Sequence, residues 1–154
     1  MYVDSYCLLS DSQALSATAV STNTYDQGSP TIQRHIGTGE PVGAVVCVEV
    51  AADFTTTDET YRFDLVQSAA AALTTPTVLA SLAFIASGSL ISSNLTAGYI
   101  FTLPIPFGMA LQRYIGMNYT LGGTTPSVTV SAFFGPLKLG MGKFVAYAKG
   151  YTIT

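Results

Sequence analysis

Between Asp64 and Arg113 the chain carries no charged side chain, and this stretch limits what the chain can fold into. A membrane-spanning helix needs about 20 consecutive apolar residues. Prolines and glycines, with many serines and threonines, interrupt every apolar run here; they are Pro76, Gly88, Gly98, Pro104 and Pro106. We therefore expect a soluble domain with few surface charges. No secretory signal is expected, because Asp4 comes early and no basic segment precedes an apolar one.

The composition favours an all-β domain. The chain has 154 residues, the size of one domain, with 9 Tyr, 8 Phe, 14 Gly and 7 Pro. Aromatic and β-branched residues suit a pleated, half-buried surface, while glycine and proline supply turns. Only 10% of the residues are charged and 49% are hydrophobic, which argues against global disorder.

Several segments have the length and the alternation of β-strands, and together they predict a jelly-roll-like β-sandwich. The predicted strands are residues 42–50, 61–66, 99–103, 113–121 and 127–134. The last two are expected to form a hairpin across residues 122–126. Residues 77–86 fit a strand or a helix, residues 8–20 an extended segment or a short helix, and the alanine-rich run 68–75 is the one convincing helix candidate. With these, six or seven strands are expected.

The predicted β domain covers residues 1–136, and residues 137–154 are interpreted as a C-terminal extension arm. The arm carries aromatic and basic side chains; they are Lys138, Lys143, Phe144, Tyr147, Lys149 and Tyr151. Ordering so many residues costs backbone entropy that a few apolar side chains do not repay alone. We therefore expect the arm to pack across a subunit boundary; an ordinary last strand of the same domain is the alternative.

The charges are unevenly distributed along the chain. Residues 1–64 hold all nine acidic residues and two arginines, a net charge of −7, whereas residues 65–154 carry four basic residues and no acid. The asymmetry is either chance in a charge-poor chain or a complementarity between neighbouring subunits. Three lysines spread along the arm make a weak basic footprint, which disfavours nucleic-acid binding.

The chain shows no catalytic, metal-binding or cofactor-binding motif. His35 is the single histidine, too few for a metal centre of the two-histidine type, and no nucleophile motif surrounds any serine. Asp58 and Glu59 lie in a threonine-rich segment that is typical of a solvated loop. Cys7 and Cys47 do not suggest a disulfide, and Cys47 is expected to be a small buried residue. We therefore predict a protein that is not an enzyme and needs no cofactor.

Short motifs along residues 1–134 resemble, in order, a family of tailed-bacteriophage capsid cement proteins, typified by that of a Bordetella podovirus. The motifs are residues 1–5 (MYVDS), 8–14 (LLSDSQA), 21–26 (STNTYD), 34–41 (RHIGTGEP), 95–99 (LTAGY), 103–104 (LP) and 113–119 (RYIGMNY). The resemblance implies an oligomeric, jelly-roll-like domain on the outside of an icosahedral head. It also suggests that Gly37, Gly39 and Gly116 allow tight backbone at strand junctions. Residues 135–154 have no counterpart in it.

The leading hypothesis is a structural virion protein on the outer capsid surface, assembled in the host bacterial cytoplasm, that bridges neighbouring major capsid proteins. Its expected partners are the major capsid protein and itself, as a homodimer or homotrimer, without nucleic acid or membrane. Arg34, Glu40 and Arg113 either form ion pairs that fix a loop or dock on the capsid. With the six arm residues named above, they make up the hypothesised interface. The alternative is a head-surface module that recognises a host receptor or glycan, which would need an exposed aromatic platform or a pocket.

Overall fold

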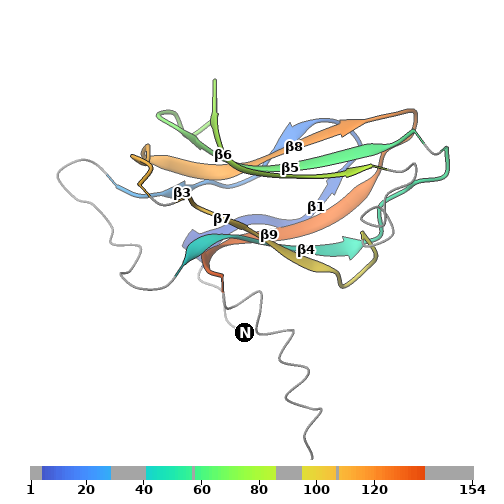
Figure 1. The fold of residues 1–154 in the computed structure, drawn as a ribbon, viewed down its shortest axis with the longest axis horizontal. Coiled ribbons are helices and arrows are strands. Elements are labelled where there is room, and N and C mark those ends of the chain that lie inside the picture. The colour runs from blue at the N-terminus through green and yellow to red at the C-terminus, as the bar shows by residue number, and fades with distance from the viewer. Residues whose placement is uncertain (1–4, 29–40, 57, 86–94, 107, 138–154) are drawn as a thin grey trace, which may run out of the picture.

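Alternating apolar side chains fold most of the chain into strands (Figure 1). The computed structural model describes residues 5–28, 41–56, 58–85, 95–106 and 108–137. Within these ranges there are nine strands and one short 3₁₀ helix. They are η1 (Ser5–Cys7), β1 (Leu8–Leu15), β2 (Ala19–Val20), β3 (Tyr25–Asp26), β4 (Val42–Val50), β5 (Thr60–Ser68), β6 (Thr77–Ile85), β7 (Ile100–Pro104), β8 (Tyr114–Gly122) and β9 (Val128–Pro136).

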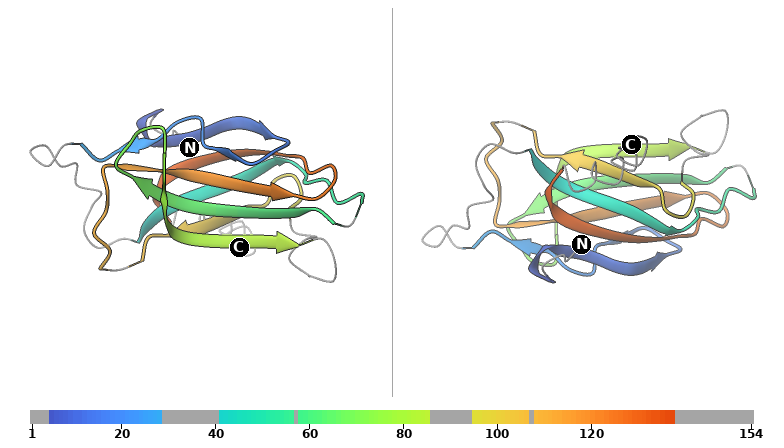
Figure 2. Two further views of the ribbon diagram at one scale, coloured as in Figure 1. Left: turned by 90° about the horizontal axis from the view of Figure 1, so that it is seen from above. Right: turned by 90° about the horizontal axis from the view of Figure 1, so that it is seen from below.

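The strands form two antiparallel sheets packed face to face, which confirms the predicted β-sandwich. One sheet has the order β1-β9-β4-β7, and the other has the order β2-β8-β5-β6 with β3 also paired to β8. When β2 and β3 are counted as one interrupted strand, this is the strand order of a jelly roll. Figure 2 shows β1 along one side of the sandwich, and β6 and β7 along the opposite side.

The core between the sheets is centred on Phe63 of β5. Its ring lies 5.0 Å from the Phe101 ring and 5.8 Å from the rings of Phe84 and Tyr119, with the ring planes steeply inclined in all three pairs. Aromatic rings favour such edge-to-face contacts because their edges are electropositive and their faces electronegative. These residues come from both sheets, so the cluster joins the two layers.

The predicted helix at residues 68–75 is wrong. Strand β5 continues through Ser68, and the residues that follow form an irregular connection to β6. In this connection Leu73 and Thr75 adopt φ values of 50° and 47°, which no right-handed helix contains. Only Leu73 of residues 69–75 is fully buried, so the alanines provide no apolar face that a short helix could pack on.

The predicted hairpin between residues 113–121 and 127–134 is also wrong. Both segments are strands, but β8 pairs with β5 in one sheet whereas β9 pairs with β1 and β4 in the other. The connecting segment therefore crosses between the sheets. Each strand buries one face in either arrangement, so their alternation does not distinguish a hairpin from a crossover.

Strand β5 differs from its predicted pattern of one buried and one solvated face. Tyr61, Phe63 and Leu65 face the core as expected, yet Asp64 and Val66 on the other face are also fully buried. Asp64 is covered through an ion pair of 2.7 Å with Arg62 and a hydrogen bond of 2.5 Å from Ser81. Strand β5 lies between β8 and β6, and side chains of these neighbouring strands shield its outer face. The alternation of residues in the sequence does not reveal this central position.

The two segments whose structure the sequence left open, residues 8–20 and 77–86, contain strands. Residues 77–85 form a strand, as do residues 8–15, so both segments are extended.

Cys47 is half-buried rather than buried, because it lies on the outer face of β4 between the inward-facing Val46 and Val48. Strand β9 ends at Pro136, and the predicted arm from residue 138 onward lies outside the described residues.

Strands β4 and β7 approach closely at Gly43, which pairs with Pro104. A methyl group added at Gly43 would lie 2.1 Å from the backbone oxygen of Leu103, so one strand would have to shift. We expect Gly43→Ala to lower the free energy of unfolding by about 1–3 kcal/mol in urea denaturation. Gly122→Ala is the control, because there the added methyl meets the movable Thr60 hydroxyl. Equal losses in both variants would contradict this explanation.

Candidate functional site

Of the interface residues predicted from the sequence, the structure describes only Arg113. The other eight lie outside the described residues; they are Arg34, Glu40, Lys138, Lys143, Phe144, Tyr147, Lys149 and Tyr151. His35, Gly37 and Gly39 lie outside them as well. Whether these residues meet a partner stays a prediction.

Arg113 forms an exposed ion pair within its own chain. Its Nε and Nη2 atoms donate to the two carboxylate oxygens of Asp26, each at 2.9 Å, and its guanidinium lies 4.9 Å from the centre of the Tyr114 ring. The hydrogen bonds from Arg113 to Asp26 raise the pKa of the guanidinium above its usual value. Next to this pair the Gln27 N–H donates to the Arg113 carbonyl at 2.8 Å. Arg113 therefore fixes the end of β3 on β8, one of its two predicted roles.

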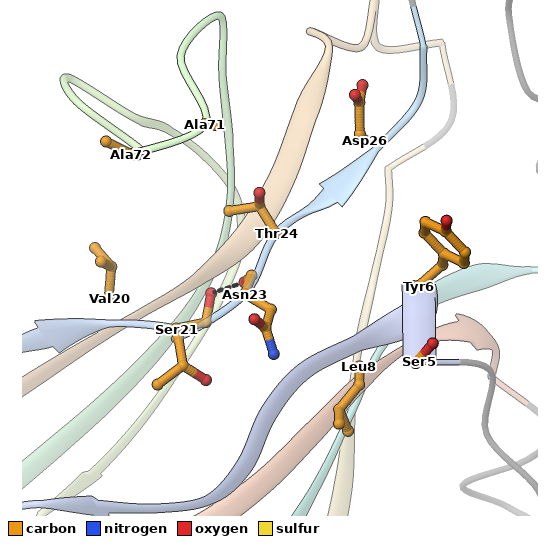
Figure 3. Close-up of a pocket in the computed structure, with 11 residues that line it drawn as sticks. Ser5, Tyr6, Leu8, Val20, Ser21, Asn23, Thr24, Asp26, Ala71 and Ala72 are labelled. Atoms are coloured by element: carbon orange, nitrogen blue, oxygen red, sulfur yellow. Dashed lines mark hydrogen bonds between the residues drawn. The ribbon is translucent and has the colours of Figure 1, made fainter.

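Beside this ion pair lies an open groove of about 760 Å³ on the side of the sandwich formed by η1, β2 and β3 (Figure 3). Tyr6 comes from η1, whereas Ala71 and Ala72 come from the β5–β6 connection on the other side of the β2–β3 segment. The groove is lined by Ser5, Tyr6, Leu8, residues 20–24, Asp26, Ala71 and Ala72.

Ser21 fixes the backbone beside the groove. Its hydroxyl donates to the Asn23 carbonyl at 2.8 Å and accepts from the Met117 N–H at 3.0 Å, while its own N–H donates to the Met117 carbonyl at 2.8 Å. Gly116 allows this close approach, since a methyl group there would lie 2.9 Å from the Ser21 hydroxyl and 2.6 Å from Leu73 Cδ1. The tight packing expected at Gly116 is present, but it lies within β8 and not at a strand junction.

The groove offers hydroxyl and amide groups rather than charge. Its lining includes the side chains of Thr22, Asn23 and Thr24, and its one carboxylate, Asp26, is held by Arg113. The Tyr6 side chain at its edge is 67% exposed. Leu8, Val20, Ala71 and Ala72 add apolar surface, so the lining is mixed and carries little charge. The groove could not be predicted from the sequence, because its lining comes from three separate parts of the chain, residues 5–8, 20–26 and 71–72.

The threonine-rich segment before β5 is not simply solvated. Asp58 is exposed as predicted, but Glu59 is fully buried. Hydrogen bonds from the Thr56 hydroxyl lower the pKa of both carboxyl groups, and Thr124 donates a further bond of 2.8 Å to Asp58. The two acids therefore join the β4–β5 and β8–β9 loops, and the solvated-loop prediction is wrong for Glu59.

The side of the sandwich opposite the groove is formed by β6 and β7. We call β6 and β7, which together contain no charged residue, the uncharged wall (Figure 2). Two of its large apolar side chains reach solvent; they are Val78 (45% exposed) and Ile85 (52% exposed), near opposite ends of β6.

Among the described residues, no cluster of three or more His, Cys, Asp or Glu side chains is placed to hold a metal ion. The same part of the chain contains no helix that is long and apolar enough to cross a membrane. In comparisons with known proteins, the model of the Bbp16 family, named like a Bordetella phage protein, matches residues 9–134. No match was found among curated proteins.

Proposed function

Because this chain belongs to the Bbp16 family, we propose that it is a structural virion protein that binds the outer surface of an icosahedral phage head. There it bridges neighbouring major capsid proteins and so stabilises the shell. The observation that carries the proposal is the family match, which spans almost the whole β-sandwich from β1 to β9. The uncharged wall supports it, since a protein that is covered by partners needs few surface charges.

The mechanism we propose is multivalent attachment. A copy that touches two capsid subunits binds the second one at a high effective concentration, so modest individual contacts give a large combined affinity. The jelly roll suits this role because its paired sheets form a rigid body that transmits force between the contacts. Residues 138–154 are the proposed second contact, with their lysines facing acidic surface on a neighbour.

The test is reconstitution of heads that lack the protein. Purified full-length chain is added to such heads, and co-sedimentation, copy number and thermal disruption of the heads are measured. We expect saturable binding at a high, symmetry-related copy number and a higher disruption temperature. An unrelated β-sandwich protein serves as the control. Absence of binding, or binding without any change in head stability, would refute the proposal.

The groove favours a second candidate, a head-surface module for a receptor or glycan. Tyr6 supplies the exposed aromatic side chain, and the hydroxyl and amide groups of residues 22–24 supply hydrogen bonds. The two candidates are distinguished by Tyr6→Ala. This variant should leave head stabilisation unchanged if the protein is a cement, and should abolish attachment to host cells if the groove reads a surface glycan.

A further inference from the structure

The four edges of the two sheets are protected to different degrees. An exposed edge strand offers unpaired N–H and C=O groups to any other strand, and proteins usually block it with bulges, charges, prolines or shortness. Three of the four edges here carry such devices. Strand β1 has two register shifts and the exposed Asp11, β7 has five residues and ends at Pro104, and β2 and β3 have two residues each.

Strand β6 is the exception. Its nine residues, Thr77–Ile85, include no charge and no proline, and among the described residues only β5 pairs with it. Its one irregularity lies opposite Leu65 and Val66, near its start. From Ala80 to Ile85 its pairing with β5 is regular, so its free edge over these residues is continuous and extended.

Both faces of β6 are suited to a further strand. On the outer face Ser81 and Ala83 are exposed and small, so a neighbouring backbone can approach without a clash. On the core face Ala80 and Leu82 are only half-buried, although they pack against the core. One more strand beside β6 would complete the burial of Ala80 and Leu82. Covering apolar surface in this way favours association.

We propose that β6 pairs antiparallel with β6 of a second copy of this chain across a two-fold axis. The sheet that contains β8, β5 and β6 then continues into the same sheet of the partner. The proposal deepens the proposed function by naming the surface through which copies meet, and it rests on that function only in expecting the protein to work beside its own copies.

Charge and symmetry select a second copy as the occupant. Each chain has a net charge of −3, so two copies repel least where they meet through a surface without charges, as the uncharged wall is. The two charged residues of the neighbouring strand β5, Arg62 and Asp64, form an ion pair with each other. An antiparallel strand pair can place the same residues on both sides of a two-fold axis, so one unprotected edge is enough to form a closed dimer.

The decisive variant is Ala83→Lys in the full-length chain. Ala83 is exposed on the outer face, so a single copy tolerates lysine there, whereas in the pair two lysines would lie close together near the axis. Sedimentation velocity over a range of concentrations should show dimers for the parent. The dissociation constant should rise at least tenfold in the variant. Ala17→Lys, at an exposed position between β1 and β2, is the matched control and should sediment as the parent does.

Hydrogen exchange of the unmodified chain tests the same surface without a substitution. Amides of residues 80–85 should become more protected as the concentration rises and dimers form. A parent that stays monomeric, a dimer that Ala83→Lys and Ala17→Lys affect equally, or β6 amides protected to the same extent at all concentrations would each overturn the proposal. The last result would mean that another part of the same chain covers this edge.

The β6 pairing and the cement role are refuted by different results. Dimers that form through β6 but do not bind heads would refute only the cement role. Heads that are bound and stabilised by a protein that is monomeric in solution and on the particle would refute only the β6 pairing.

Discussion

Replacing Phe63 with alanine should lower the free energy of unfolding by about 3–5 kcal/mol, the range for truncation of a large core aromatic side chain. Phe63 is fully buried and touches three other rings, from both sheets. A domain of this kind has a total stability of about 5–15 kcal/mol, so the loss is a large fraction of it. Urea denaturation followed by circular dichroism measures it directly.

The size of the loss depends on the cavity that the missing ring leaves. Phe84 and Phe101 also contact each other, with ring centroids 5.4 Å apart, so a ring that moved into the cavity would lose part of this contact. Phe63→Leu keeps most of the volume and should cost less than about 1.5 kcal/mol. If leucine and alanine destabilise equally, ring–ring geometry rather than volume holds the two sheets together.

The strands could be predicted from the sequence because burial leaves a period of two in the chain. Phe101 and Leu103 on β7, and Val128 and Val130 on β9, alternate with less buried residues as expected. The period of two does not show which strands pair with each other. It depends on which sheet each strand joins, and the pattern of β8 and β9 is the same in a hairpin as in a crossover.

Local composition does not predict the structure where tertiary contacts determine it. The alanines after Ser68 have high helix propensity, but their segment must reverse the chain between β5 and β6 within a few residues. Likewise Glu59 has the appearance of a loop residue, yet it is buried by threonines of its own and a neighbouring loop. The contact with Thr125 is 66 positions away in the chain, so the sequence around Glu59 does not reveal it.

The candidate surfaces could be predicted only in part. The uncharged wall follows from the sequence, because the uncharged residues 65–112 contain both β6 and β7. That these strands lie on the same side of the sandwich follows from the jelly-roll order alone. The groove at Tyr6 and the role of Asp26 as the partner of Arg113 require the three-dimensional arrangement, since 87 positions separate the two charges.

A buried tyrosine links the two sheets and should make the protein sensitive to alkaline pH. Tyr119 of β8 is fully buried, and its hydroxyl lies 2.7 Å from the Ser10 hydroxyl of β1. Ser10 uses its own proton in a bond of 2.7 Å to Gln13 Oε1, so the Tyr119 hydroxyl donates to Ser10. An ionised Tyr119 could not make this bond and would be a charge in an apolar core.

Burial raises the pKa of Tyr119 well above its ordinary value. Below about pH 10 both the folded and the unfolded chain keep the phenol proton, and this group gives no pH dependence. Above it the unfolded chain loses the proton while the folded chain keeps it, so the folded state binds more protons. Stability therefore falls by about 1.4 kcal/mol for each pH unit, or roughly 3 kcal/mol by about pH 12. Burial also raises the pKa of Tyr61, which acts in the same direction.

Tyr119→Phe separates this effect from general alkaline damage. At neutral pH the variant should lose only about 1 kcal/mol, because Ser10 keeps Gln13 as its acceptor. Above about pH 10 its stability should fall less steeply than that of the parent, by the equivalent of one proton. The measurement is guanidinium denaturation at a series of pH values from neutral to about pH 12. Parallel curves for the two proteins would show that Tyr119 does not control alkaline unfolding, and that the link between β8 and β1 contributes packing alone.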